Sequence, residues 1–108
     1  MKIIISSQSN KIDSLMDLRF GRCKYFCVYD TETKDIRYIE NDAINASGGA
    51  GIQAANQVIK EDGEFVITGN LGPNASRVLE NANIKVYITE VKKVVDIIND
   101  YNENRLNN

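Results

Sequence analysis

The sequence predicts a single α/β domain with a mixed five-stranded sheet and three helices, in the order βββαβαβα. Short runs rich in isoleucine and valine, typical of strands, stand at the N-terminus and again at 65–68 and 84–88. The last two runs alternate with amphipathic helical patterns, as in parallel crossover units. With 108 residues, of which 43% are hydrophobic, the chain is long enough for one core and too short for two.

Three strands are expected in the first half of the chain. Residues 2–6 form an isoleucine-rich run that ends in a polar cluster. Residues 8–19 follow as an irregular or weakly helical segment. Residues 25–30 and 36–40 are rich in aromatic and β-branched residues, and the polar turn at 31–35 joins them as an antiparallel hairpin. We expect four apolar side chains to pin the irregular segment to the body: Ile12, Leu15, Met16 and Leu18.

A helix, a strand and a second helix are expected after the hairpin. The glycine-rich stretch 47–51 opens the first helix, and Gly63 is expected to stop it. The strand at 65–68 then runs through a glycine turn into the second helix. Pro73 is well placed at the first position of that helix, where its missing N–H costs nothing.

The last strand is expected at 84–88, and the third helix directly after it. Thr89 is a good N-cap, and Val91 is the first member of the apolar face that follows. Residues 102–108 are polar and are expected to fray, so the domain itself is predicted to span residues 1–101.

Loops from distant parts of the sequence are expected to meet at one edge of the sheet. This follows if the second strand is antiparallel to the first and the other strands are parallel to the first. Open α/β sheets bind ligands outside the carboxyl ends of their strands, and helix N-termini favour anions there. We therefore expect an anion site on a rim, defined by four segments: 6–10, 19–23, 45–51 and 68–74.

Backbone amides and two guanidinium groups are the predicted donors of this site. Arg19 and Arg22 could clamp an anion, since guanidinium offers rigid donors and stays charged. The alternative is a structural interaction with Asp13, Asp17 or a helix C-terminus. Glycines would let the backbone approach a ligand. The predicted backbone and amide donors are Gly48, Gly49, Gly51, Gly69, Asn70 and Gly72.

The segment between the two arginines is expected to anchor the rim to the body. Phe20 is most simply an anchor that buries this loop. Gly21, next to it, is expected to permit a positive φ.

Cys23 is the candidate metal ligand of the rim, because nearby arginines would favour its thiolate. A buried thiol that only packs is the commoner alternative, and it is the interpretation we favour for Cys27 within its strand. The chain has no histidine, which removes the commonest metal ligand and general base. Two cysteines also fall short of the four ligands usual for a cluster or a closed zinc site.

Composition and motifs argue against several classes of function. The net charge of −2 and a pI of about 5.1 disfavour a nucleic-acid surface. No apolar run is long enough for a signal peptide or a membrane span, so we expect a cytoplasmic protein with reduced cysteines and no membrane partner. The glycine loop lacks the Lys and Ser/Thr of a phosphate-binding Walker loop, and the first strand lacks the carboxylates of a nuclease.

Four motifs follow one another along the chain: Arg19-Phe20-Gly21-Arg22-Cys23 with Tyr25-Phe26, Gly48 to Ala55, Val66 to Ala75, and Ile84 to Tyr87. Together, and in this order, they resemble the dinitrogenase iron-molybdenum cofactor biosynthesis family. The members of this family are small domains of the NifX type, which also form the carboxyl-terminal part of NifB proteins. The resemblance covers nearly the whole domain, from Met1 to about Tyr101.

This resemblance implies a ribonuclease H-like fold and a non-catalytic role as a carrier. The implied cargo is an iron-molybdenum or iron-sulfur type cluster or its precursor, bound transiently, and the implied partners are the proteins that donate or accept it. Many nitrogenase members have His at the position of Arg19. This chain has no histidine, so imidazole ligation is impossible here. The alternative function is a small enzyme or sensor that uses the same rim to bind a phosphorylated metabolite or a nucleotide.

Overall fold

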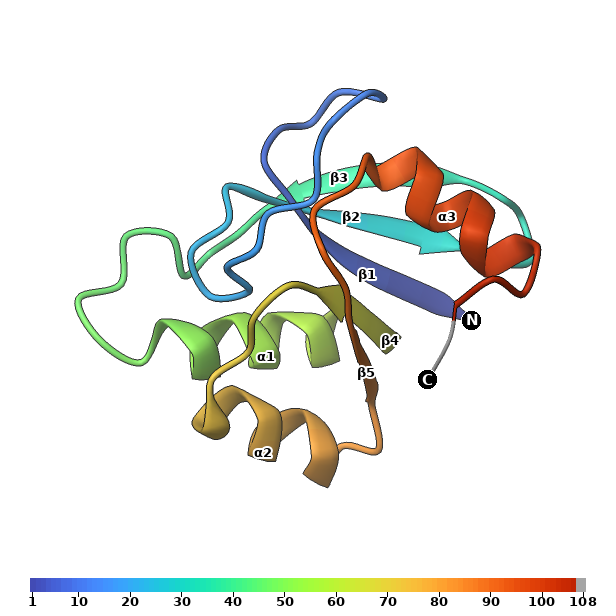
Figure 1. The fold of residues 1–108 in the computed structure, drawn as a ribbon. Coiled ribbons are helices and arrows are strands. Elements are labelled where there is room, and N and C mark those ends of the chain that lie inside the picture. The colour runs from blue at the N-terminus through green and yellow to red at the C-terminus, as the bar shows by residue number, and fades with distance from the viewer. Residues whose placement is uncertain (107–108) are drawn as a thin grey trace.

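Five strands form one mixed sheet in the structure, a computed structural model that describes residues 1–106 (Figure 1). Three helices accompany the sheet, so the predicted α/β class with a five-stranded mixed sheet and three helices is confirmed. The elements are β1 (Lys2–Ser7), β2 (Tyr25–Asp30), β3 (Ile36–Glu40), α1 (Ala50–Lys60), β4 (Gly63–Thr68), α2 (Pro73–Asn81), β5 (Lys85–Ile88) and α3 (Val94–Asn102).

The strands are arranged in the order β3-β2-β1-β4-β5. β2 is antiparallel to both of its neighbours, whereas β4 is parallel to β1 and to β5. In the central register, Ile4 lies opposite Val28 on one side and Val66 on the other. The carboxyl ends of β1, β3 and β4 and the start of β2 therefore lie at the same edge of the sheet, as the rim requires.

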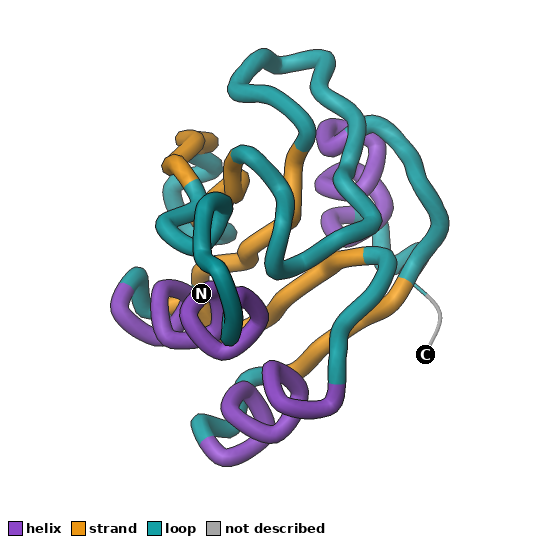
Figure 2. The backbone as a smooth tube through the Cα atoms, turned by 90° about the vertical axis from the view of Figure 1, so that its left-hand side faces the viewer, coloured by secondary structure: helices purple, strands orange, loops and turns teal. Residues whose placement is uncertain are grey.

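Alternation along the strands divides the interior into two cores. Ile4 faces the core shared with α1 and α2, while Ile3 and Ile5 face the core shared with α3. Figures 1 and 2 show α1 and α2 on one side of the sheet and α3 on the other. All three isoleucines are at most 1% exposed, and each contributes about 1.5–3 kcal/mol by burial. β1 is thus the buried centre on which the rim is supported.

The end of α1 differs from the prediction. The helix ends at Lys60, before the predicted stop at Gly63, and Asp62, with φ of 61°, adopts the left-handed conformation. Gly63 is instead the first residue of β4. A Cβ atom there would lie 2.7 Å from Cγ1 of Ile4 and 2.8 Å from Cγ1 of Val58, so the position needs glycine for close packing.

The start of α3 also differs, because the helix begins at Val94 and Thr89 does not cap it. Thr89 donates its N–H to the carbonyl of Thr68 at 3.0 Å and so prolongs the pairing of β5 with β4. Lys93 forms an isolated bridge with Leu15. The segment before α3 is therefore occupied by extended pairing, and the helix begins four residues later than a cap at Thr89 would place it.

The segment 8–19 is irregular, but its expected anchoring is mostly wrong. Met16 is fully buried. Ile12, Leu15 and Leu18 expose 73%, 43% and 47% of their surface. Backbone hydrogen bonds, such as that from the N–H of Asp17 to the carbonyl of Ser6, attach this segment to the body instead of the three exposed side chains.

The chain turns back after α3 and packs against it. The N–H of Arg105 donates to the carbonyl of Asp100 at 2.7 Å, and its guanidinium forms an ion pair with the same residue at 3.0 Å. Fraying was predicted for residues 102–108. Two of these, residues 107 and 108, lie outside the described residues. The longest described helix has 11 residues, and none of the described helices could cross a bilayer.

Candidate functional site

The segments of the rim meet in space. Arg19 forms a parallel bridge with Asn70, and the N–H of Phe20 donates to the carbonyl of Asn70 at 3.3 Å. The hydroxyl oxygens of Ser6 and Thr68 lie 2.7 Å apart, which joins the ends of β1 and β4. These contacts bring residues that are about 50 and 60 positions apart in sequence to one edge of the sheet.

Glycines make this convergence possible where backbones touch. A Cβ atom on Gly69 would lie 2.3 Å from Cδ2 and 2.9 Å from Cα of Leu18. A Cβ atom on Gly51 would lie 3.2 Å from the Cβ of Ala75, which brings α1 against α2. The two positions have little room for a larger residue, so Gly51 and Gly69 serve packing as well as any ligand.

Two helix N-termini open onto the rim without a side-chain cap. α1 starts after Gly49, which has φ of 67°, and α2 starts after Gly72 with Pro73 in its first turn, as predicted. Neither helix has an acidic residue in its first turn. A Cβ atom on Gly48, Gly49 or Gly72 would meet nothing within 4 Å, so the space there is open. At each of these helix starts, free amides and the positive end of the helix dipole thus adjoin open space.

Arg19 is bound to a carboxylate of its own segment. Its Nε and one terminal nitrogen donate to the two oxygens of Asp17, each at 3.1 Å. This hydrogen-bonded pair raises the pKa of Arg19. Asp17 is buried, whereas the Arg19 side chain is 66% exposed. The ion-pair alternative is therefore realised for Arg19, and the guanidinium keeps its exposed side toward solvent.

Arg22 instead holds a loop. Its guanidinium donates to the carbonyl of Ala46 at 2.7 Å, and it forms no ion pair within residues 1–106. The loop between β3 and α1 that it holds projects from the body in Figure 1. Arg22 is thus an exposed cation whose charge no carboxylate of the described chain offsets.

Cys23 is buried, and its environment opposes a thiolate. Its thiol contacts the carbonyl of Phe20 at 3.5 Å and the amide nitrogen of Asn41 at 3.7 Å. Burial, followed by the nearby charge of Asp17, raises its pKa to about 12. The expected lowering of the pKa by the arginines is therefore wrong. Metal ligation by Cys23 stays a prediction. It requires Asn41 and the loop that follows it to move away from the thiol.

The second cysteine lies on the other face of the sheet. Cys27 belongs to the core beneath α3, whereas Cys23 belongs to the core of α1 and α2. Both are free, and burial raises the pKa of Cys27 to about 12. No group of three or more His, Cys, Asp or Glu side chains among residues 1–106 could hold a metal ion.

The prediction for Phe20 is confirmed, whereas the prediction for Gly21 is wrong. Phe20 is 2% exposed and lies 5.4 Å, between ring centroids, from Phe26, so the anchor is confirmed. Gly21 does not adopt a positive φ; among the described glycines only Gly49 does. A Cβ atom on Gly21 would lie 3.0 Å from the nitrogen of Gly51, so close approach explains this glycine.

Asn41 supports the rim segment 19–23 from outside the four segments, and no sequence motif identified it. It is 1% exposed, and its side-chain nitrogen donates to the carbonyls of Gly21 at 3.2 Å and Cys23 at 2.9 Å. Its side-chain oxygen accepts the N–H of Ala43 at 2.9 Å. An asparagine just after a strand is a turn signal, which was the available hint.

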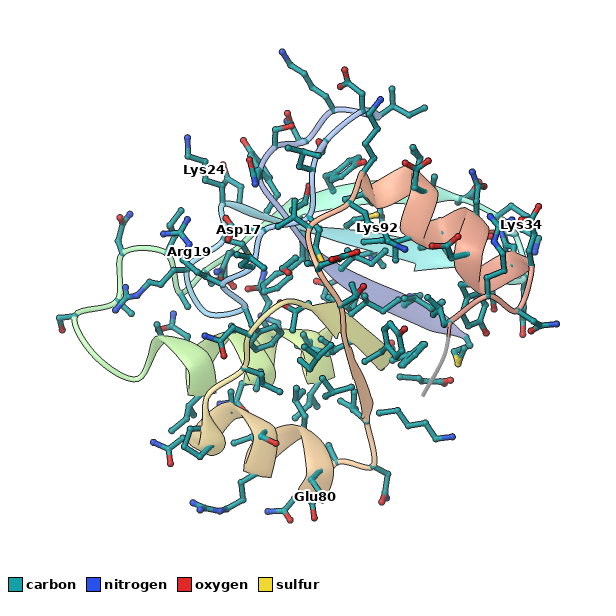
Figure 3. The ribbon with its side chains drawn as sticks, in the orientation of Figure 1. Asp17, Arg19, Lys24, Lys34, Glu80 and Lys92 are labelled. Atoms are coloured by element: carbon teal, nitrogen blue, oxygen red, sulfur yellow. The ribbon has the colours of Figure 1, made fainter. Side chains whose placement is uncertain are left out.

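Lys24 adds a further cation at the same edge. With Asp17 and Arg19, which are labelled beside it in Figure 3, it lines a hollow of about 470 Å³. Leu18 and Val91 form the apolar part of this hollow. The rim segment 19–23 therefore adjoins a surface that carries both cationic and apolar side chains.

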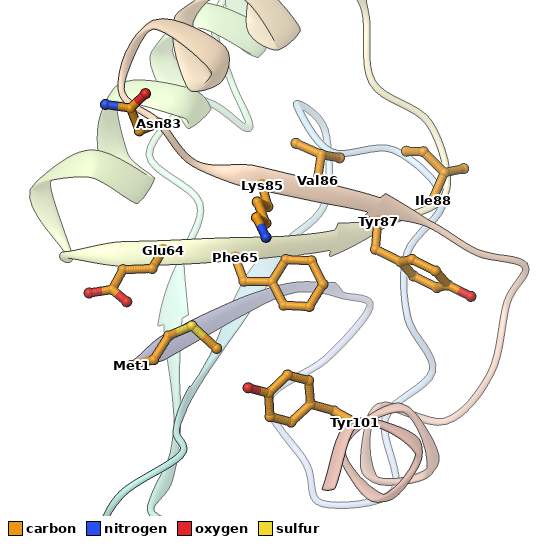
Figure 4. A pocket seen from close by; sticks show the side chains of 9 residues that line it. All are labelled: Met1, Glu64, Phe65, Asn83, Lys85, Val86, Tyr87, Ile88 and Tyr101. Carbon is orange, nitrogen blue, oxygen red and sulfur yellow. The ribbon is translucent and has the colours of Figure 1, made fainter. Parts of the chain in front are cut away.

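A larger hollow lies elsewhere, on the face of the sheet that α3 covers. It measures about 1010 Å³, and its walls include Phe65, Lys85, Tyr87 and Tyr101 (Figure 4). The rings of Phe65 and Tyr101 lie 6.1 Å apart between centroids. None of the predicted site residues lines this groove.

Comparison with known proteins identifies similar chains. Residues 1–104 match the family described as dinitrogenase iron-molybdenum cofactor. The apo form of the orange protein from Desulfovibrio gigas is 31% identical with a TM-score of 0.91, covering 98% of this chain and 90% of that one. A candidate NifB protein from Thermotoga is 32% identical with a TM-score of 0.83, covering 96% and 89%. The uncharacterized protein MJ0580 of Methanocaldococcus jannaschii is 28% identical over 109 residues, covering 98% and 89%.

Proposed function

We propose a function from one premise: the chain belongs to the dinitrogenase iron-molybdenum cofactor family. The protein binds a negatively charged metal-sulfur cluster of iron-molybdenum or iron-sulfur type, or a precursor, and carries it during cofactor assembly. An apo form is named for the Desulfovibrio relative, which implies a loaded form of that protein, and the Thermotoga relative carries the NifB name. Both names support a cargo-binding role for this chain.

The pair of open helix N-termini is the observation that carries this proposal. Gly49 and Gly72 precede helices that have no side-chain cap and no first-turn carboxylate, and the space in front of them is open. A sulfide-rich cluster is an anion with many acceptor atoms. Backbone N–H groups and helix dipoles can therefore hold it without covalent ligands. Such a mode of binding suits a cargo that must later be released.

Two arginines supplement the amides in this proposal. Arg22 contributes a guanidinium group that forms no ion pair with a described carboxylate. Arg19 is paired with Asp17, so only the solvent-facing part of its guanidinium is available to a ligand. Cys23 can add a covalent bond only after the loop held by Asn41 and Arg22 opens, since the thiol is now buried. The first contact of the cargo is therefore electrostatic.

The proposal is a non-catalytic role. The rim has no histidine, and the pKa of its cysteine is raised, so it lacks a base or nucleophile poised for turnover. The partners are the proteins that donate or accept the cluster, and the location is cytoplasmic. We also assign the sheet to the ribonuclease H-like type within this proposal.

Anaerobic reconstitution tests the proposed cargo. The protein is incubated with iron, sulfide and molybdate, desalted, and examined by visible absorption and metal analysis. We expect colour to stay with the protein, and Arg22→Ala to retain several-fold less than the parent. Arg37→Ala is the matched control, because Arg37 pairs with Glu61 and lies outside the rim.

The result separates the two functions. If no colour is retained while a nucleotide binds saturably, the carrier proposal is wrong and the phosphate-binding alternative is favoured. Cys23→Ser tests the covalent contribution in the same assay. If both Arg22→Ala and Cys23→Ser retain the parent amount, the assignment of these residues to the site is wrong.

A further inference from the structure

Large aliphatic side chains are exposed beside the rim. Ile12, Leu15 and Leu18 are exposed on the segment 8–18, and Val91 is 40% exposed on the segment that pairs with it. Leu18 and Val91 line the same hollow, and Leu15 pairs with Lys93, two residues from Val91. We call these four side chains the docking patch. A group of aliphatic side chains exposed together is typical of interaction surfaces.

Hydrogen bonds fix the backbone under this patch. The N–H of Gln8 donates to the carbonyl of Leu15 at 2.9 Å. Ser14, only 4% exposed, accepts the N–H of Lys11 on its hydroxyl oxygen at 3.0 Å, and its carbonyl accepts the N–H of Val94 at 2.9 Å. The apolar side chains are thus held in water by a fixed turn, which lowers the entropy cost of binding a partner.

The charge around the patch is opposite to that of the whole chain. Segments 8–24 and 88–93 hold six of the 13 Lys and Arg residues but only three of the 15 Asp and Glu residues. Their net charge is therefore +3, whereas the whole chain has −2. Lys11, Lys24 and Lys93 are exposed and form no ion pair within residues 1–106, while the unpaired carboxylates nearby are Asp13 and Glu90.

We propose that the docking patch binds a partner protein that presents an apolar surface edged by carboxylates. Aliphatic contacts supply affinity, and the surrounding lysines select acidic partners and speed their encounter. Leu18 also contacts Gly69, the first residue of the loop that leads into α2, so a partner seated on the patch adjoins one segment of the rim. The partner is then in position to deliver or collect the cargo, a role that rests on the proposed function.

A pair of synthetic peptides tests this chemistry. One is an amphipathic helical peptide with leucine on one face and glutamate on the other, and the second has lysine in place of every glutamate. Each is titrated into the labelled full chain and followed by amide NMR shifts. We expect saturable shifts at Ile12, Leu15, Leu18 and Val91 with the glutamate peptide, and binding at least tenfold weaker with the lysine peptide.

Variants locate the interaction. Ile12→Ser/Leu15→Ser is expected to bind the glutamate peptide at least fivefold more weakly, with an unchanged unfolding midpoint because both side chains are exposed. Ile52→Ser/Ile59→Ser on α1 is the matched control, with 38% and 40% exposure. Lys11→Glu/Lys24→Glu/Lys93→Glu should weaken glutamate-peptide binding and strengthen that of the lysine peptide.

Several results would overturn the inference. These are no binding of the glutamate peptide, equal binding of both peptides, or shifts centred on the groove of Phe65, Tyr87 and Tyr101. Self-association through the patch, or binding of anionic phospholipid vesicles without the peptide, would assign the patch to a different occupant. Cargo retention by Ile12→Ser/Leu15→Ser should equal that of the parent. If the parent protein retains no cluster colour after desalting, the carrier role is refuted, and the peptide result still stands on its own.

Discussion

The Cα of Gly21 lies against the start of α1, where a Cβ atom on Gly21 would stand 3.0 Å from the nitrogen of Gly51 and 3.3 Å from the carbonyl carbon of Ala50. Both neighbours are backbone atoms and cannot rotate away. This contact joins the arginine-bearing segment of the rim to an open helix N-terminus. The positions of Arg22 and the α1 amides are therefore coupled by backbone packing.

Gly21→Ala is expected to destabilise the protein by about 1–3 kcal/mol, because the added methyl group forces apart two backbones. Urea unfolding measures this change. Gly48→Ala is the control, since a Cβ atom there meets nothing within 4 Å, and it should change stability by less than about 0.5 kcal/mol. Equal effects of the two substitutions would contradict the packing role of Gly21.

Asn41→Ala is expected to cost about 1–3 kcal/mol, since it leaves the buried carbonyl of Cys23 and the N–H of Ala43 without a partner. The loop over Cys23 should also open more often, so an aromatic disulfide reagent should react with this thiol faster. Asn45→Ala, at an exposed position of the same loop, should leave both quantities unchanged. Unchanged thiol reactivity in Asn41→Ala would show that Asn41 does not hold the loop.

Local patterns were enough to predict much of the fold. The isoleucine run of β1 and the junction from Thr68 to Pro73 contain their own signals, because alternation and a proline at the first helical position depend on neighbouring residues alone. Extended pairing replaced the expected cap at Thr89, which donates to Thr68 across the sheet edge. Tertiary hydrogen bonding of this kind leaves no mark in a short sequence window.

The site was less predictable, because its chemistry depends on distant residues. Arginines near Cys23 in sequence suggested a lowered pKa, yet burial and the charge of Asp17 raise it. Asn41, which covers this thiol, is 18 residues away. Ile12 looked like an anchor by composition, but a hydrogen-bonded turn holds it outward. Hydrophobicity alone does not tell a core side chain from a docking side chain.

Stability is expected to fall above about pH 9, because the folded-state pKa of Cys23 and Cys27 is raised to about 12 while unfolded thiols titrate near about 8.5. Between these values the unfolded state loses protons that the folded state keeps, so the free energy of unfolding decreases as pH rises. The slope is at most about 1.4 kcal/mol per pH unit for each thiol. Urea unfolding of the parent and of Cys23→Ala/Cys27→Ala should show a smaller alkaline slope in the variant; equal slopes would contradict the assignment.

Asp17→Asn is expected to lower the pKa of Cys23, because the Asp17 carboxylate is the second cause, after burial, that raises it. The substitution also releases the Arg19 guanidinium, whose charge then favours the thiolate instead of pairing with Asp17. Ultraviolet absorbance of the thiolate as a function of pH measures the shift in a Cys27→Ala background, where Cys23 alone reports. Asp13→Asn, an exposed carboxylate of the same segment, should leave this pKa where it is. If both variants titrate like the parent, burial alone sets the protonation of Cys23, and the Asp17–Arg19 pair has no part in controlling the thiol.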